Sequence, residues 1–125
     1  MKLKNILIVV NDLEQSIHFY KTLFGLQVTL DNDTNVILTE GLVLQDASVW
    51  KDAISKEILP QNNASLLYFE ERDMDAFFDK LNTYDESIQY VTPLTTLPSG
   101  QKLIRLYDPD GNLIEVRTPL FSSVQ

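Results

Sequence analysis

Cysteine is absent from this chain of 125 residues, and glycine and histidine are scarce. Without cysteine there is no disulfide, no thiolate metal ligand and no cysteine nucleophile, and the composition fits a reducing compartment. The four glycines lie singly at expected turns, so the chain has no glycine-rich loop for binding phosphate. The one histidine, His18, lies in a predicted helix, and this placement argues against a Ser–His–Asp triad.

Basic residues are also few, because 10 Lys and Arg stand against 18 Asp and Glu, for a net charge of −8. Nucleic acid and anionic membrane surfaces are therefore poor partners, since both attract clustered Lys and Arg. Long apolar runs are lacking too. The N-terminal run ends at Asn11-Asp12, so we expect neither a signal peptide nor a transmembrane span, and a cytoplasmic location.

The first half of the chain is predicted to form a strand, a helix and three more strands. Residues 5–10 are apolar and β-branched, which predicts a buried strand. Asp12 followed by Gln15 resembles a capping box at the start of a helix, and Gly25 is a typical helix end. Short strands are expected at 27–30, 35–38 and 42–46. The predicted buried face of the helix consists of Leu13, Ile17, Tyr20 and Phe24.

The second half repeats this order after a less regular stretch. Residues 47–64 lack a clear pattern, with a short helix expected over 51–59 and a linker at 60–63. Strands are then predicted at 65–69, 87–91, 102–107 and 112–116, and Asp108-Pro109-Asp110-Gly111 is a type I turn signature. Asp73 is expected to cap the second helix, whose buried face would carry Met74, Phe77, Phe78 and Leu81.

This duplication predicts an α+β fold of two βαβββ modules. A half of about sixty residues could not easily bury a sheet alone. Two halves together would form one curved, mostly antiparallel eight-stranded sheet, with the helices outside and a groove inside. Fused repeats commonly bind ligands at such a junction.

Two motifs carry a resemblance to a known superfamily. The sequence VNDLEQSIHFY over 10–20, followed by Phe24-Gly25-Leu26, resembles the opening module of vicinal oxygen chelate proteins, the group of glyoxalases, bleomycin-resistance proteins and extradiol dioxygenases. The sequence DPDGNLIEV over 108–116 resembles the closing hairpin of their second module. The resemblance implies one domain over 1–120, with module one at 2–59, module two at 64–118 and a flexible tail at 119–125. It also implies a homodimer.

Members of that superfamily typically hold a divalent metal at four strand positions, where it acts as a Lewis acid on the substrate. By register from the two motifs, these positions are Asn5, Gln45, Leu66 and Glu115. Only Glu115 is anionic, and Leu66 cannot ligate a metal. A tight site needs three or four donors around one point. We therefore expect no metal and no other cofactor.

Further groove residues follow from the strand alternation, which places Tyr68 in phase with the four positions. Trp50 could stack on a planar ligand, or serve as a core or dimer contact. Arg105 and Tyr107 share one face of their strand, so Arg105 could pair with Glu115 or bind a carboxylate ligand, or both could face solvent. Glu115 is either a general base or ligand contact, or an inherited strand residue paired with Gln45 or water.

Three functions remain compatible with these residues. The favoured one is a metal-free binder of a small, partly aromatic organic molecule, and enzymatic activity is less favoured but left open. The second is a metal-dependent lyase, isomerase or dioxygenase of the glyoxalase type. The third is a structural module whose pocket is closed by bulky inward residues such as Leu66. The predicted ligand contacts are Asn5, Gln45, Trp50, Leu66, Tyr68, Arg105, Tyr107 and Glu115, with Glu115 as the catalytic candidate.

Overall fold

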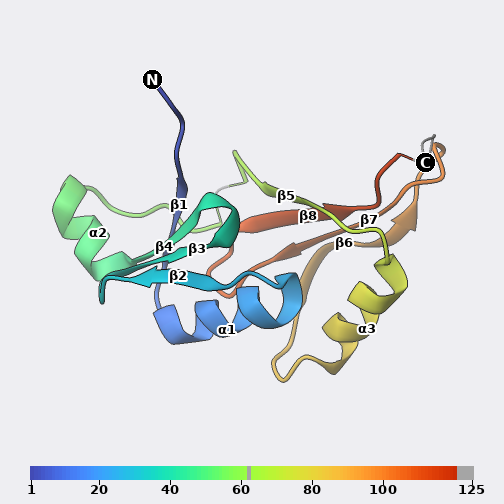
Figure 1. The fold of residues 1–125 in the computed structure, drawn as a ribbon, viewed down its shortest axis with the longest axis horizontal. Coiled ribbons are helices and arrows are strands. Elements are labelled where there is room, and N and C mark those ends of the chain that lie inside the picture. Colours follow the sequence, from blue (N-terminus) through green and yellow to red (C-terminus); the bar gives the residue numbers. More distant parts are fainter. Residues whose placement is uncertain (62, 121–125) are drawn as a thin grey trace. The chain divides into compact units, whose positions relative to one another are not determined.

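The computed structural model describes residues 1–61 and 63–120, and the chain divides into two compact units, Met1–Pro60 and Gln61–Gln125. Each unit contains a strand, a helix and three further strands in that order (Figure 1). In each unit these strands form a four-stranded mixed sheet. The α+β fold of two βαβββ modules is thus confirmed. The eight strands are hydrogen-bonded as two sheets of four, whereas the sequence predicted one sheet.

The first unit is a sheet in the order β1-β4-β3-β2. Strand β1 is parallel to β4, and the other two pairs are antiparallel. Strands β1 and β4 can be parallel because the chain crosses through α1 from β1 to β2, the strand at the opposite edge of the sheet. The elements are β1 (Ile6–Val10), α1 (Leu13–Phe24), β2 (Val28–Asp31), β3 (Asn35–Leu38), β4 (Leu42–Asp46) and α2 (Ala47–Ile54), with a 3-10 turn at Thr39–Gly41 before β4.

Helix α1 begins and ends where the sequence predicts. The Asp12 carboxylate accepts a hydrogen bond from the Gln15 backbone N–H at 3.1 Å, and Gly25 adopts a left-handed φ of 70° at the C-cap. The buried face differs slightly from the prediction. It consists of Ser16, Phe19, Tyr20 and Leu23, while Leu13, Ile17 and Phe24 are half-buried.

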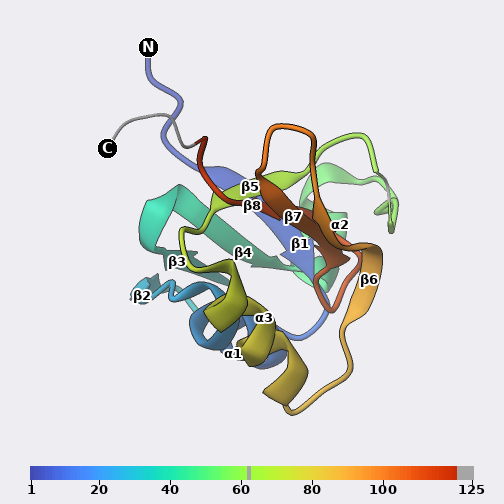
Figure 2. The same ribbon diagram turned by 90° about the vertical axis from the view of Figure 1, so that its right-hand side faces the viewer.

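The second unit has the corresponding order, β5-β8-β7-β6. Figure 2 shows these four strands side by side. Strands β5 and β8 are parallel, and the other pairs are antiparallel. Asp73 caps α3 through the Ala76 N–H, and the helix buries Met74, Phe77 and Leu81. The elements are β5 (Leu67–Glu70), α3 (Met74–Thr83), β6 (Gln89–Thr96), β7 (Lys102–Tyr107) and β8 (Leu113–Arg117).

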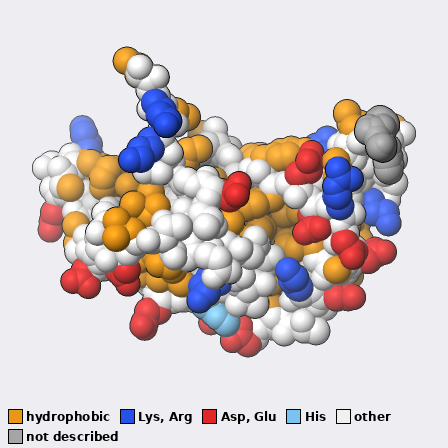
Figure 3. Space-filling view, in the orientation of Figure 1, with side chains coloured by type: hydrophobic (Ala, Val, Ile, Leu, Met, Phe, Trp, Pro, Cys, Tyr) orange, Lys and Arg blue, Asp and Glu red, His pale blue; other side chains and the backbone are white. Residues whose placement is uncertain are grey.

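Strand β6 lies at one edge of this sheet and is longer than predicted. The sequence predicts a strand over 87–91, and Pro93 beyond it cannot donate a ladder hydrogen bond. At an edge this loss is tolerated, and the pairing with β7 shifts register between Tyr90 and Thr92 and again between Thr92 and Thr95. Hydrophobic side chains reach the surface on the face that Figure 3 shows. In β6, Tyr90 and Val91 are exposed.

The stretch between the modules is more regular than predicted. Helix α2 begins at Ala47 and not at residue 51, because the Asp46 carboxylate accepts from the backbone N–H groups of Ser48 and Val49. It ends at Ser55, which adopts a left-handed φ of 54°. In the described part of the chain, no helix is long and apolar enough to cross a membrane. The predicted flexible tail lies outside the described residues from 121 onward.

Candidate functional site

Polar and aromatic side chains form one row across all four strands of the second unit's sheet. Tyr68 on β5 is paired with Glu115 on β8, Glu115 with Arg105 on β7, and Arg105 with Thr92 on β6. Residues paired across strands project to the same side of a sheet, and Arg117 joins them because it lies two residues after Glu115. We call Tyr68, Thr92, Arg105, Glu115 and Arg117 the polar face.

The opposite side of the same strands is apolar. Ile104, Leu106, Ile114 and Val116 alternate with the polar-face residues, and each is at most 1% exposed. This alternation excludes a slip of β7 against β8 by one residue, since such a slip would bury the charged side chains and expose the apolar ones. The hydrophobic core of the unit therefore determines where the charged side chains point.

Glu115 is at the centre of an ion-pair cluster. Its Oε1 accepts from Nε of Arg105 at 2.7 Å, and its Oε2 accepts from Nη2 of Arg117 at 3.0 Å and from Nε at 3.1 Å. The Glu115 side chain is 6% exposed, compared with 34% for Arg105 and 25% for Arg117. Nη1 of Arg105 also donates to the Thr92 hydroxyl at 3.2 Å. A buried carboxylate is thus enclosed by two partly exposed guanidinium groups.

These contacts answer one question that the sequence left open. The predicted pairing of Arg105 with Glu115 is confirmed, and the carboxylate has Arg117 as its second partner, where the sequence offered Gln45 or water. Both carboxylate oxygens accept from guanidinium groups, so Glu115 acts as an acceptor that orients two cationic side chains.

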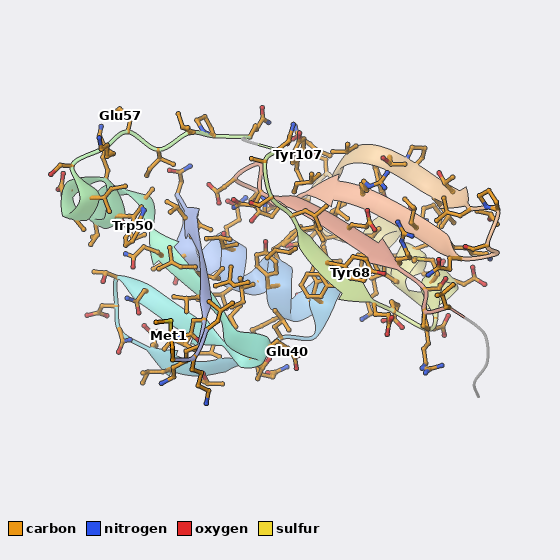
Figure 4. All side chains as sticks on the ribbon, turned by 90° about the horizontal axis from the view of Figure 1, so that it is seen from above. Met1, Glu40, Trp50, Glu57, Tyr68 and Tyr107 are labelled. Atoms are coloured by element: carbon orange, nitrogen blue, oxygen red, sulfur yellow. The ribbon has the colours of Figure 1, made fainter. Side chains whose placement is uncertain are left out.

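Figure 4 labels two of the predicted residues, Tyr68 of the polar face and Tyr107. The Tyr68 side chain on β5 is 53% exposed, so its ring is available to a ligand. Tyr107, at the end of β7, is half-buried, and its hydroxyl donates to Oδ1 of Asn63 at 2.8 Å. Leu66 precedes β5 and is 42% exposed, which contradicts the expectation that it fills the core. Leu66 therefore does not support the hypothesis of a structural module with a closed pocket.

The predicted residues of the first unit have different surroundings. Gln45 is buried on β4, where its Nε2 donates to the Thr34 carbonyl at 3.1 Å and its Oε1 accepts from Nδ2 of Asn35 at 3.4 Å. Asn5 is exposed just before β1. Trp50 lies in α2 and is half-buried, so it belongs to a capped helix and not to an irregular segment (Figure 4).

Two members of the polar face, Thr92 and Arg117, were not predicted from the sequence. Arg117 could have been found, because it lies two residues after Glu115 and strand alternation places it on the same face. Thr92 could not, because the predicted strand ended at residue 91 before Pro93. Its place beside Arg105 depends on the register shifts of an edge strand.

The residues present do not fit the metal site that the resemblance implies. No group of three or more His, Cys, Asp and Glu that could hold a metal ion occurs within residues 1–61 and 63–120. Glu115 already binds two cationic side chains, and Leu66 has no donor atom. His18 is exposed on α1, as predicted, with the Thr22 hydroxyl 3.3 Å from its Nδ1. These residues therefore do not supply the set of metal ligands that the usual chemistry of the superfamily requires.

Comparisons with known proteins agree with this fold. A protein of unknown function from Agrobacterium tumefaciens str. C58 has a TM-score of 0.80 and 29% identity, covering 96% of this chain and 95% of its own. A glyoxalase-related enzyme from Fulvimarina pelagi has a TM-score of 0.79 and 19% identity, covering 94% and 88%. A fosfomycin resistance protein from Listeria monocytogenes has a TM-score of 0.75 and 13% identity, covering 97% and 95%.

The likeness to the last two structures, at 19% and 13% identity, shows the fold alone. No curated protein matches the sequence. The sequence does match the family described as a glyoxalase-like domain, over residues 3–121. This match includes both units and the complete polar face. The chain therefore belongs to the glyoxalase-like domain family, within the vicinal oxygen chelate superfamily.

Proposed function

We propose that the chain is a metal-independent binding protein for a small, partly aromatic organic molecule, and that the polar face contributes to its binding surface. The observation that carries this proposal is the state of Glu115. At the strand position where the superfamily places a metal ligand, the carboxylate is buried between Arg105 and Arg117. Binding a metal there would first require the loss of these ion pairs.

The polar face has the groups that a small organic ligand needs. Ligand sites usually combine apolar or aromatic surface with a few polar groups that fix the ligand's orientation. The exposed ring of Tyr68 offers stacking area, and the guanidinium groups offer hydrogen-bond donors in a fixed plane. Asn5, Gln45 and Trp50 of the first unit stay predictions as ligand contacts.

An enzyme of the glyoxalase type is the alternative. Relatives in fold include a lactoylglutathione lyase from Agrobacterium tumefaciens, with a TM-score of 0.66 and 19% identity over 98% of this chain and 97% of its own. Such an activity in this chain would need a metal or another reactive group. The described residues contain no suitable metal cluster, and this favours binding over metal-dependent catalysis.

A binding screen with a matched pair of tyrosine variants tests the proposal. We expect at least one compound from a panel of small phenols, aromatic acids and catechols to shift NMR signals of polar-face residues in metal-free protein. Tyr68→Ala should weaken that binding. Tyr90→Ala is the control, because Tyr90 is also exposed but pairs with Leu106, on the other side of the sheet.

Two results would count against a metal-independent binder. One is the absence of any saturable binder in the panel. The other is near-stoichiometric Zn, Ni, Mn or Fe in natively purified protein, coupled to turnover of a thiol adduct or a catechol. In the second case the metal-dependent enzyme would replace our proposal.

A further inference from the structure

We propose that Arg105 and Arg117 recognise the carboxylate of a small organic acid, and that Glu115 serves to hold their guanidinium groups in place. This inference rests on the proposed function, and it names the class of ligand. It assigns a role to the ion-pair cluster that neither the family match nor the likeness to solved structures supplies.

Arg105 and Arg117 have more N–H donors than their contacts with Glu115 and Thr92 use. Arginine carries five N–H donors. Arg105 uses Nε toward Glu115 and Nη1 toward Thr92, and Arg117 uses Nε and Nη2 toward Glu115. Among the residues that the structure describes, Nη2 of Arg105 and Nη1 of Arg117 have no partner. Each guanidinium therefore keeps a donor for a ligand.

The ion-pair cluster also carries an excess of positive charge. Two guanidinium groups surround one carboxylate, so the cluster has a net charge of +1 in a chain whose net charge is −8. The negative group is the buried one, and the two positive groups are partly exposed. A ligand approaching this cluster meets the cations first. Partial burial also strengthens its interaction with them compared with charges in open water.

A carboxylate beside the cluster favours one direction of binding for the acid. Glu70 on β5 is paired with Arg117 on β8 and is exposed, so it places a second carboxylate on this side of the sheet. Repulsion from Glu70 disfavours an anion at the Arg117 end. The ligand carboxylate should therefore bind mainly to Arg105, which lies toward β6 and away from Glu70.

The spacing of strands then suggests the shape of the acid. Tyr68 and Arg105 lie in one row, separated by β8, which corresponds to about 10 Å at the usual strand spacing. An aromatic ring on Tyr68 and a carboxylate on Arg105 need a short flexible spacer between them. An arylalkanoic acid such as 3-phenylpropanoate has this shape, and its amide has the same shape without the charge.

The experiment compares 3-phenylpropanoate with 3-phenylpropanamide by NMR titration of the full chain. We expect the acid to bind at least about tenfold more tightly than the amide, as fits a charge-assisted contact. Arg105→Gln should remove most of that preference. Arg72→Gln is the matched control, because Arg72 is an exposed arginine of the same unit and should leave the preference unchanged.

A second variant covers the case in which Arg105→Gln fails to fold. Replacing Arg105 and Glu115 together by Gln removes one charge of each sign, and it leaves only Arg117, whose side chain is 25% exposed, without its carboxylate partner. The double variant should retain the wild-type amide affinity and lose the preference for the acid. Amide signals across the sheet report whether each variant is folded.

The outcomes separate this inference from the proposed function. Equal affinity for acid and amide, unchanged by Arg105→Gln, would overturn carboxylate recognition while leaving a neutral ligand site in place. A preference that Arg72→Gln also abolishes would show unspecific attraction to surface charge, and would overturn it as well. If neither probe nor any member of the wider panel binds, both proposals fail.

Discussion

Glu115 shows how a single residue can be kept in place while its surroundings change its chemistry. Its strand and register match the position where the superfamily places a metal ligand, and its side chain is bound by Arg105 and Arg117. A carboxylate in that state acts as an acceptor that orients two cations. Both the stability of the sheet and the geometry of the polar face should then depend on Glu115.

Replacing Glu115 by Gln should lower the free energy of unfolding by about 2 kcal/mol, because the two arginines lose their charged partner at a buried position. Partial exposure of both arginines limits the loss. Urea unfolding at neutral pH measures it. Glu70→Gln, on the same side of the sheet but exposed, should change stability by no more than about 0.5 kcal/mol. Equal effects of the two variants would contradict the role of the cluster.

Tyr84 provides a pH-dependent test. Burial, followed by the negative charges of Asp85 and Glu86, raises its pKa to about 12, from an ordinary value of 10.0. A raised pKa means that the folded state disfavours the phenolate. The stabilising contribution is therefore complete below pH 10 and is lost as the pH rises through 12. Tyr84→Phe should reduce the fall in stability over this range, and Tyr68→Phe should not. Unfolding curves in alkaline buffers would reveal either result.

At the scale of the element, the Asp46 cap determines where α2 begins. Asp46→Ala removes acceptors for the N–H groups of Ser48 and Val49 and should cost about 1 kcal/mol. Asp52→Ala, inside the same helix, should be neutral or slightly stabilising, because alanine favours helix. Denaturant titration of both variants compares the two sites directly.

The same cap predicts a dependence on acid. The hydrogen bond from the Ser48 hydroxyl, followed by the one from the Val49 N–H, lowers the pKa of Asp46 from its ordinary value of 3.8. Its stabilising contribution is therefore present above that value and is lost as the pH falls through the lowered pKa. The difference in stability between the wild type and Asp46→Ala should shrink in acid. A difference that stays constant would exclude an ionised cap.

Gly111 belongs to the turn between β7 and β8, where its N–H donates to the Asp108 carbonyl. It has a positive φ of 82°, and a Cβ placed on it would clash with Gln61 of the preceding linker. Gly100 has a similar φ of 90° with open space around it. Alanine should cost about 1–2 kcal/mol at either site through backbone strain. At Gly111 the clash should add about 1 kcal/mol or more. If thermal unfolding shows the same loss of stability for both variants, Gln61 moves aside at no energetic cost.

The elements that the sequence predicted best are those whose ends are set locally. Strands β3, β4 and β7 have the predicted bounds, because turn residues and polar groups delimit them. Asp12 and Asp73 likewise set the starts of two helices. The end of β6 could not be predicted, because tolerance of Pro93 depends on its position at a sheet edge, which is a property of the assembled sheet.

At the scale of the whole molecule, the repeated order of elements was the strongest signal in the sequence. It predicted the fold and, through two motifs, the superfamily. The candidate site was predicted only in part. Alternation placed Tyr68 and Glu115 on one face, but the exact partners of Glu115 depend on how β7 and β8 pair, and local sequence does not specify that pairing.

Stability of the whole chain should not depend on divalent metal. Since the described residues offer no cluster of three suitable ligands, dialysis against EDTA should leave the urea midpoint unchanged. Adding Zn, Ni, Mn or Fe afterwards should not raise it, whereas a ligand that binds only the folded state would. A clear rise with one metal, abolished by Glu115→Ala, would show that a metal site forms despite the ion pairs.

The irregular edge strand β6 has a consequence for how the protein behaves at high concentration. A flat edge is a template on which another chain can add a strand, and this is a common start of fibrillar aggregation. Pro93 has no N–H to offer such a strand, and the two register shifts interrupt the regular spacing of the neighbouring groups. Tyr90 and Val91 are exposed beside these irregularities, and such apolar side chains favour association. The irregularities therefore reduce the tendency of this edge to pair with a strand of another chain. Replacing Pro93 should lower the solubility of the protein more than its free energy of unfolding.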